Sequence, residues 1–313
     1  MSRTSGYAQS VLEHDRKSKI SDTSMETRNV QKTGNMHYFY LPTSWCRDRK
    51  LSSKSKVSIS YGSDGSLVIS PQHAERKPKH LKFSIKEDDQ DIIHKLVVAS
   101  YINPAGSFDI SLEKEMDFTK LLNQKRLISL ESVEIDQKQI TCQGAVSITS
   151  PESLLKTMVK KIRNMMIVME KNYDRGLIER YEDEMDRSKM LIDKAMIGAL
   201  TDGGARISTI ELYYISSIAR ELERVVDHLI TLEGKDMRFV REIYRPMEIL
   251  QRIVEDPSKL NLDLSLEFAK SVSRIKKRRI SDIKSNEIEQ LRQNLVAISE
   301  VVMDWMVTIK LES

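Results

Sequence analysis

Two pairs of carboxylates in the C-terminal half of the chain have the residue types and the spacing to bind a metal ion. Glu182 and Asp186 lie four residues apart in one helical segment, and Glu223 and Asp227 lie four apart in the next. Residues at i and i+4 share one face of a helix, so each pair projects its two carboxylates together. Apolar neighbours place each pair at the edge of a buried stripe. We therefore predict that these four side chains hold a cation between two helices.

Carboxylate oxygens suit hard or intermediate cations, so the expected cofactor is a divalent or trivalent metal ion such as Mg²⁺, Mn²⁺, iron or Zn²⁺. The alternative is an ordinary solvated face, in which Glu223 pairs with Arg220 and Asp227 pairs with Arg224. Like charges four residues apart weaken a helix by only about 0.2–0.5 kcal/mol. Spacing alone therefore leaves both interpretations open.

Charge is distributed unevenly along the chain. Residues 26–79 contain ten Lys and Arg against four Asp and Glu, a net charge of +6, whereas residues 80–150 contain eight against eleven, a net charge of −3. A positive module beside an acidic one is the distribution expected where the positive module meets phosphate groups.

Common catalytic patterns do not occur in this sequence. It has no HExxH motif, no nucleophile elbow and no glycine loop of the phosphate-cradling type, and its six histidines are scattered. The adjacent glycines Gly203 and Gly204 fall between helical segments rather than after a strand. We therefore expect a protein that is not an enzyme.

The carboxylate pairs need a helical scaffold, and residues 150–313 supply one. From Pro151 onward, behind the capping residue Ser150, apolar residues recur at spacings of three and four. The pattern predicts an antiparallel bundle of six amphipathic helices in two sets of three. The first three carry Leu155–Met169, Ile178–Ile192 and Ile215–Leu229, and the second three cover Asp236–Val254, Leu264–Ile280 and Glu287–Lys310.

Residues 80–149 alternate between strand-like and helix-like patterns, which predicts a small α/β linker module. Asp88 and Asp89 are candidate N-caps of its first helix. The expected elements are strand Leu81–Ile85, helix Asp88–Tyr101, strand Ser107–Leu112, helix Asp117–Asn123, and strands near Leu130–Ile135 and Gln139–Ile148.

Residues 25–72 have a β-like pattern, with alternation in Met36–Pro42 and Val57–Tyr61, a turn into Ser66–Pro71, and a short helix near Ser44–Lys50. So few large apolar side chains make a thin core, and we expect this unit to fold as an intertwined homodimer or within a higher homo-oligomer. Residues 1–24 show no sustained period and are expected to form a mobile tail. The fold class predicted for the whole chain is thus multidomain α+β.

Composition limits where such a protein could act. A length of 313 residues implies two or three domains, and the two cysteines, Cys46 and Cys142, lack a metal-ligand spacing. A reducing, cytoplasmic location is expected. No apolar run approaches the roughly 20 residues that span a bilayer, so the chain is not expected to be membrane-inserted.

Two stretches of the helical half resemble a known family. IARELERVVDHLI (Ile218–Ile230) and RYEDEMDRSKMLI (Arg180–Ile192) resemble the acidic helices of PhoU proteins, which are built from three-helix repeats. The resemblance implies that Glu182, Asp186, Glu223 and Asp227 form one metal site in a protein of phosphate homeostasis. The later helices lack this motif and Lys270–Ser281 is basic, so a second metal cluster is not expected.

The N-terminal stretch Arg28–Pro71 resembles the AbrB/SpoVT swapped-hairpin fold, as found ahead of PhoU domains in archaeal fusion proteins. The matching segments are VQKTG, LPTSW and DGSLVISP, and the middle module resembles the region between the two domains in such fusions. Family glycines are replaced in Asn35–His37 and Ser53–Val57. The resemblance implies a homodimer that contacts double-stranded DNA through Arg28, Lys32, His37, Arg47, Arg49 and Lys50.

Two functions follow from these resemblances. The first is a DNA-binding transcriptional regulator of phosphate uptake or phosphate homeostasis, with a metal-binding sensor bundle. The second is an accessory protein that restrains a phosphate transporter or a signalling partner, with the N-terminal unit used only for dimerisation. Binding of duplex DNA with a steep dependence on salt concentration distinguishes the first from the second.

Overall fold

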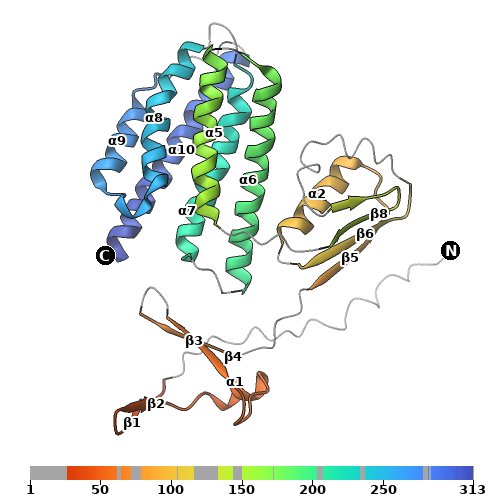
Figure 1. Ribbon diagram of the computed structural model, residues 1–313, viewed down its shortest axis with the longest axis vertical. Coiled ribbons are helices and arrows are strands. Elements are labelled where there is room, and N and C mark those ends of the chain that lie inside the picture. The colour runs from red at the N-terminus through yellow and green to blue at the C-terminus, as the bar shows by residue number, and fades with distance from the viewer. Residues whose placement is uncertain are drawn as a thin grey trace, which may run out of the picture. The chain divides into compact units, whose positions relative to one another are not determined.

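The computed structural model describes residues 27–61, 65–71, 79–103, 105–115, 133–143, 150–171, 173–202, 207–232, 237–277, 281 and 283–312. These residues form small β-sheets followed by a helical C-terminal region, which confirms the mixed α+β class (Figure 1). The chain divides into two compact units, with the boundary between Ala74 and Glu75. The tail expected at residues 1–24 lies outside the described residues.

The N-terminal unit consists of two antiparallel hairpins and a short helix. Its elements are β1 (Gln31–Thr33), β2 (Met36–Tyr38), α1 (Thr43–Asp48), β3 (Val57–Tyr61) and β4 (Leu67–Pro71). Gly34 has a φ of 60° in the two-residue turn between β1 and β2, a conformation that glycine adopts at little cost. The strand expected over Met36–Pro42 was too long, because β1 offers only three pairing residues and Pro42 has no N–H to donate.

The second unit begins with the α/β module, whose described residues form a four-stranded sheet with one helix on its face (Figure 1). Its elements are β5 (His80–Ile85), α2 (Gln90–Ile102), β6 (Ser107–Leu112), β7 (Val133–Ile135) and β8 (Gln139–Gln143), in the order β5-β6-β8-β7. Strands β5 and β6 are parallel and joined through α2, and β8 is antiparallel to both β6 and β7. Asp89 is the N-cap, as expected, since its carboxylate accepts hydrogen bonds from the N–H groups of Asp91 and Ile92. The helix expected at Asp117–Asn123 lies outside the described residues.

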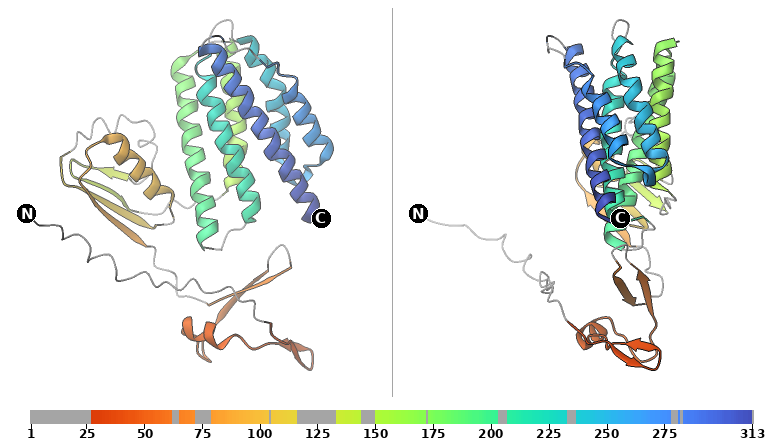
Figure 2. Two further views of the ribbon diagram at one scale, coloured as in Figure 1. Left: turned by 180° about the vertical axis from the view of Figure 1, so that it is seen from behind. Right: turned by 90° about the vertical axis from the view of Figure 1, so that its left-hand side faces the viewer.

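The described residues from 150 onward form six α-helices, as predicted, which run roughly along a common direction (Figure 2). They are α5 (Pro151–Lys171), α6 (Arg175–Asp202), α7 (Thr209–Leu229), α8 (Met237–Glu255), α9 (Leu262–Ser273) and α10 (Ile283–Glu312), with a short 3₁₀ turn, η2 (Pro257–Lys259), between α8 and α9. All six contribute to a single hydrophobic core. Helix α7 packs against both α6 and α10, so the two sets of three helices are merged rather than separate.

The α/β module shares its core with the bundle through α6. Met190 of α6 is buried among apolar side chains of α2 and the sheet. The ammonium group of Lys194, also on α6, donates a hydrogen bond to the backbone carbonyl oxygen of Tyr101. It also lies 4.6 Å from the centre of the aromatic ring of Tyr101. Burial at this contact lowers the pKa of Lys194 and raises the pKa of Tyr101. A buried methionine and a partly desolvated lysine therefore hold the module against α6.

Because the bundle has one core, a cavity in the second set of helices should destabilise the whole bundle. Phe268 of α9 is fully buried, and Phe268→Ala is expected to lower the free energy of unfolding by about 3–5 kcal/mol. Leu262, at the start of the same helix, is half exposed, and Leu262→Ala is expected to cost no more than about 0.5 kcal/mol. Urea unfolding of the full chain, followed by helical circular dichroism, measures both. Two separated helical transitions in Phe268→Ala would contradict a shared core.

Candidate functional site

Three of the four predicted metal ligands come together between α6 and α7. Asp186, Glu223 and Asp227 each place one carboxylate oxygen so that these atoms all lie within 4.8 Å of one another. Glu223 and Asp227 are one turn apart on α7, and Asp186 reaches them from α6. All three side chains are partly buried. The structure therefore brings carboxylates of the two acidic helices close together.

The fourth predicted ligand, Glu182, does not lie within 4.8 Å of all three. It stands one turn before Asp186 on α6. The i,i+4 rule places Glu182 on the correct face of its helix, but it does not select the rotamer of a side chain with three torsion angles.

Buried apolar side chains next to the carboxylate trio in sequence hold its two helices together. Met185, Leu222 and Val226 are all buried, and each is adjacent in sequence to a member of the trio. Partial burial of the trio reduces solvent screening, so like charges at this separation repel one another. A bound cation would reverse the sign of that interaction. All-oxygen ligands of this kind suit Mg²⁺, Mn²⁺ or iron better than soft metals.

Ion pairs lie beside the trio on both helices. Arg224 pairs with Glu221 at 2.9 Å, and Lys189 pairs with Asp193 at 2.8 Å. Asp193 also accepts a hydrogen bond from Ser216, at 3.3 Å, which ties α6 to α7 beyond the trio. His228, next to Asp227, contacts Glu287 of α10 at 2.6 Å. Sequence reasoning did not single out Glu287, because it lies 59 residues from its partner.

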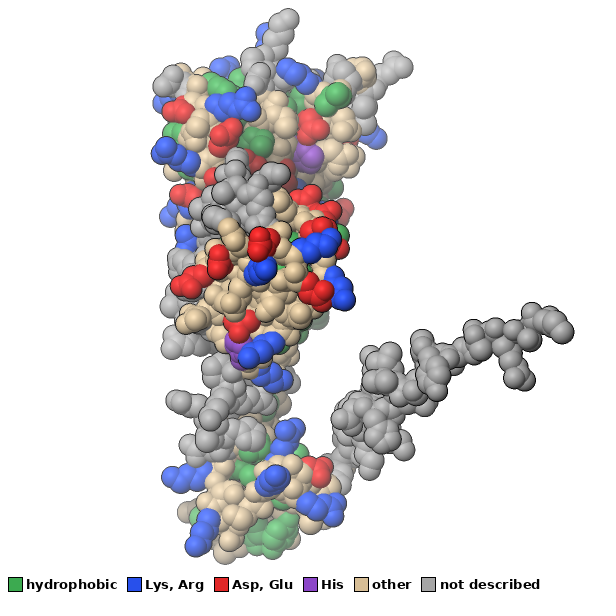
Figure 3. Space-filling view, turned by 90° about the vertical axis from the view of Figure 1, so that its right-hand side faces the viewer, with side chains coloured by type: hydrophobic (Ala, Val, Ile, Leu, Met, Phe, Trp, Pro, Cys, Tyr) green, Lys and Arg blue, Asp and Glu red, His purple; other side chains and the backbone are tan. Residues whose placement is uncertain are grey.

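The candidate DNA contacts all lie on the surface of the N-terminal unit. Arg28, Lys32, His37, Arg47, Arg49 and Lys50 are each exposed. Lys32 and His37 are register partners in the β1–β2 hairpin and so share one of its faces. On the face drawn in Figure 3, Lys and Arg predominate over the N-terminal unit, whereas Asp and Glu mix with them on the α/β module. The unit thus presents positive charge from its first hairpin and from the end of α1.

Lys50 has an unusual backbone conformation at the end of α1. Its φ is 52°, and it is the position after the helix where glycine is most common. The N–H of Lys50 bonds to the carbonyl of Arg47, and the N–H of Leu51 bonds to that of Cys46, the two bonds of a Schellman motif. This left-handed conformation costs a non-glycine residue about 1 kcal/mol of conformational free energy. The motif turns the chain just after Arg47 and Arg49 and keeps Lys50 exposed beside them.

A turn without glycine leads into the second hairpin. The N–H of Ser52 bonds to the side chain of Ser55 at 2.9 Å, and the N–H of Ser55 bonds to the carbonyl of Ser52 at 3.0 Å. These hydrogen bonds close the turn before β3. The AbrB/SpoVT family, which this segment resembles, has a glycine there. A serine side chain thus supplies by hydrogen bonding what glycine supplies by conformational freedom.

Another polar cluster was missed from the sequence because it joins two strands. His80 of β5 contacts the hydroxyl of Ser107 at 2.6 Å and the carboxylate of Asp109 at 3.0 Å, both on β6. The three side chains lie on the face of the sheet opposite Phe108 and Ile110, which pack with α2 in the module core. His80 and Ser107 are 27 positions apart in the sequence, which leaves no local signal for such a cluster.

Comparison with known protein families, with characterised proteins and with solved structures gives no match for this chain. Among the described residues, none of the helices combines the length and the apolar character needed to cross a membrane. The chemistry of the residues themselves therefore carries the functional inference.

Proposed function

We propose that the protein is a DNA-binding transcriptional regulator of phosphate homeostasis, a binding protein rather than an enzyme, whose helical domain holds a metal ion. The observation that carries the proposal is the exposed positive charge of the N-terminal unit. Its six candidate contacts are all exposed, and residues 26–79 carry a net charge of +6. Lys and Arg arranged in this way neutralise backbone phosphates, and Arg also pairs with guanine edges.

Dimerisation of the N-terminal unit supports the proposal, because a second copy doubles the number of phosphate contacts. The β3–β4 hairpin has an apolar face, formed by Val57, Ile59, Tyr61, Leu67 and Ile69. None of the described residues of this unit is buried, and Tyr61 and Ile59 are 85% and 58% exposed. An isolated two-stranded hairpin is marginally stable in water. A second copy of the same face would cover these side chains and complete a core.

The carboxylate trio supports the sensing half of the proposal. Asp186 on α6 and Glu223 and Asp227 on α7 would share one divalent or trivalent cation, and α7 in turn packs against α10. The link to phosphate homeostasis rests on the resemblance of these two helices to PhoU proteins. In this proposal the occupancy of the metal site adjusts the packing of α6 against α7.

A second candidate function is that of an accessory protein for a transporter or signalling partner. The observation that favours it is a basic cluster in the residues just after α9. Arg274, Lys276 and Lys277 are exposed and have no ion pair among the described residues. On α8, by contrast, Arg241 and Arg252 pair with nearby glutamates. An acidic surface on a partner protein would complement this basic cluster.

A salt titration of duplex DNA binding tests the first function. The variant Arg28→Ala/Arg47→Ala/Arg49→Ala removes about six phosphate contacts from a dimer, so the slope of log affinity against log salt should fall by about five. The matched control removes the same charge from the helical domain, as Arg175→Ala/Arg241→Ala/Arg252→Ala, and should keep the wild-type slope. Equal slopes for the two variants would reject the N-terminal surface. No binding by the wild type at low salt would favour the accessory function.

A further inference from the structure

The hydrogen-bonded cluster of His80, Ser107 and Asp109 belongs neither to the metal site nor to the candidate DNA contacts. Ser107 and Asp109 are two residues apart on β6, so their side chains emerge on the same face of the sheet, about 7 Å apart. His80, on the neighbouring strand β5, is the register partner of Ser107. Its imidazole spans the gap, with one ring nitrogen 2.6 Å from the Ser107 hydroxyl and the other 3.0 Å from the Asp109 carboxylate. The spacing of the two strands therefore places the three side chains in a row.

The two contacts of His80 determine which ring nitrogen carries the proton. A carboxylate accepts hydrogen bonds and donates none, so Nε2 of His80 is the donor toward Asp109. In a neutral imidazole the other nitrogen, Nδ1, is then unprotonated and accepts the hydroxyl proton of Ser107. The Ser107 oxygen thus has a base within hydrogen-bond reach, and a carboxylate orients that base. This is the arrangement that activates a serine as a nucleophile, with the roles of the two ring nitrogens exchanged.

The cluster is open to small molecules. The side chains of His80 and Asp109 are 37% and 29% exposed, and Ser107 is partly exposed. Lys82, two residues after His80 on β5, is the register partner of Asp109 and emerges on the same face. It is exposed and has no ion pair in the part of the chain that the structure describes. Its ammonium group is therefore available to approach the negative charge that develops when a carbonyl group is attacked beside it.

We propose that Ser107 is a site of covalent acylation, which takes acyl groups from small activated esters. The Ser107 oxygen attacks the carbonyl carbon of the ester while its proton passes to Nδ1 of His80. The bond between that carbon and the leaving oxygen then breaks, and His80 returns the proton to the leaving group. The acyl group stays on Ser107 as an ester, and Asp109 stabilises the protonated imidazole on the way. This modification is independent of the proposed regulatory function and of the metal site.

Ser111 gives the experiment an internal control. It lies on β6 and on the same face as Ser107, and it is exposed, but it has no hydrogen bond to an imidazole among the described residues. The full-length protein is incubated with p-nitrophenyl acetate, and the acetylated positions are mapped by peptide mass spectrometry over time. Because a positioned base typically accelerates such a step by about 10²–10⁴-fold, Ser107 should be acetylated at least about 100-fold faster than Ser111. Equal acetylation of the two serines in the wild type would overturn the proposal without recourse to any variant.

Two variants then test the role of the imidazole. His80→Gln retains a polar side chain but removes the base, so acetylation of Ser107 should slow by about 100-fold. Lys95→Gln removes an exposed charge from α2 and should leave the rate unchanged. Circular dichroism shows whether each variant keeps the helical content of the wild type. Acetylation of Ser107 at the wild-type rate in a folded His80→Gln protein would also overturn the proposal, because the serine would then react without its base.

Discussion

The variant Glu223→Ala/Asp227→Ala should retain no stoichiometric metal after reconstitution, whereas the wild-type chain should hold about one ion. The double substitution removes two of the three carboxylates that converge within 4.8 Å, and Asp186 alone offers too few ligands. Elemental analysis after incubation with Mg²⁺, Mn²⁺, iron and Zn²⁺, followed by removal of excess ion, measures the loss and identifies the preferred metal.

The matched control for this experiment removes two carboxylates from the same helices outside the trio. Glu184 of α6 pairs with Lys161 and Glu221 of α7 pairs with Arg224, so Glu184→Ala/Glu221→Ala should bind metal normally. Metal binding by the Glu182→Ala variant then tests whether the fourth predicted residue is a ligand. Weakened binding means that Glu182 turns toward the trio when metal enters. Absence of metal from the wild type after every reconstitution would contradict the site.

The second large effect is expected at the β3–β4 hairpin. Ile59 and Ile69 are register partners on its apolar face, and replacing both with Asp should raise the dimer dissociation constant by more than about 100-fold, because charge is then buried in an apolar interface. Sedimentation of the full chain over a range of concentrations measures the change. A variant that cannot dimerise through this hairpin should also lose most of its affinity for DNA.

The control for this experiment adds the same charge to the other face of the same hairpin. Ser58 precedes Ile59 on β3, and Ser70 follows Ile69 on β4. The two serines are also register partners, and both are exposed. Ser58→Asp/Ser70→Asp should stay dimeric. If the isoleucine variant keeps the assembly state of the wild type, then the helical half drives association and this face has another role.

Much of the fold could be predicted from the sequence because its signals are local. The bundle helices follow from apolar residues at spacings of three and four, and their starts follow from short-range caps such as Ser150, whose hydroxyl accepts from the N–H of Ser153 at 3.2 Å. The two carboxylate pairs of the candidate site follow from the same period. Strand extents were less certain, as the shortened β2 illustrates, because a strand ends where its partner ends.

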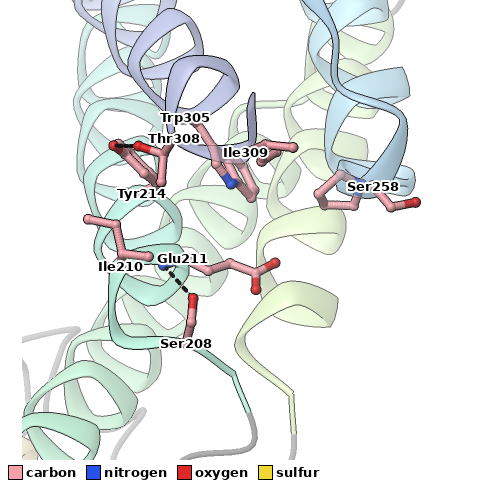
Figure 4. Close-up of a pocket in the computed structure, with 9 residues that line it drawn as sticks. Ser208, Ile210, Glu211, Tyr214, Ser258, Trp305, Thr308 and Ile309 are labelled. Atoms are coloured by element: carbon pink, nitrogen blue, oxygen red, sulfur yellow. Dashed lines mark hydrogen bonds between the residues drawn. The ribbon is translucent and has the colours of Figure 1, made fainter. Parts of the chain in front are cut away.

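Features that depend on contacts between distant segments were decided only by the tertiary structure. The i,i+4 spacing aligns Glu182 with Asp186, but the packing of α6 against α7 and the choice of rotamers leave Glu182 outside the trio. The entry of Met190 into the core of the α/β module has no sequence signal, since periodicity marks a residue as buried without naming the neighbour that buries it. A cavity beside Trp305 and Tyr214 arises in the same way. Its walls come from α7, η2 and α10, which lie far apart along the chain and are brought together only by their packing (Figure 4).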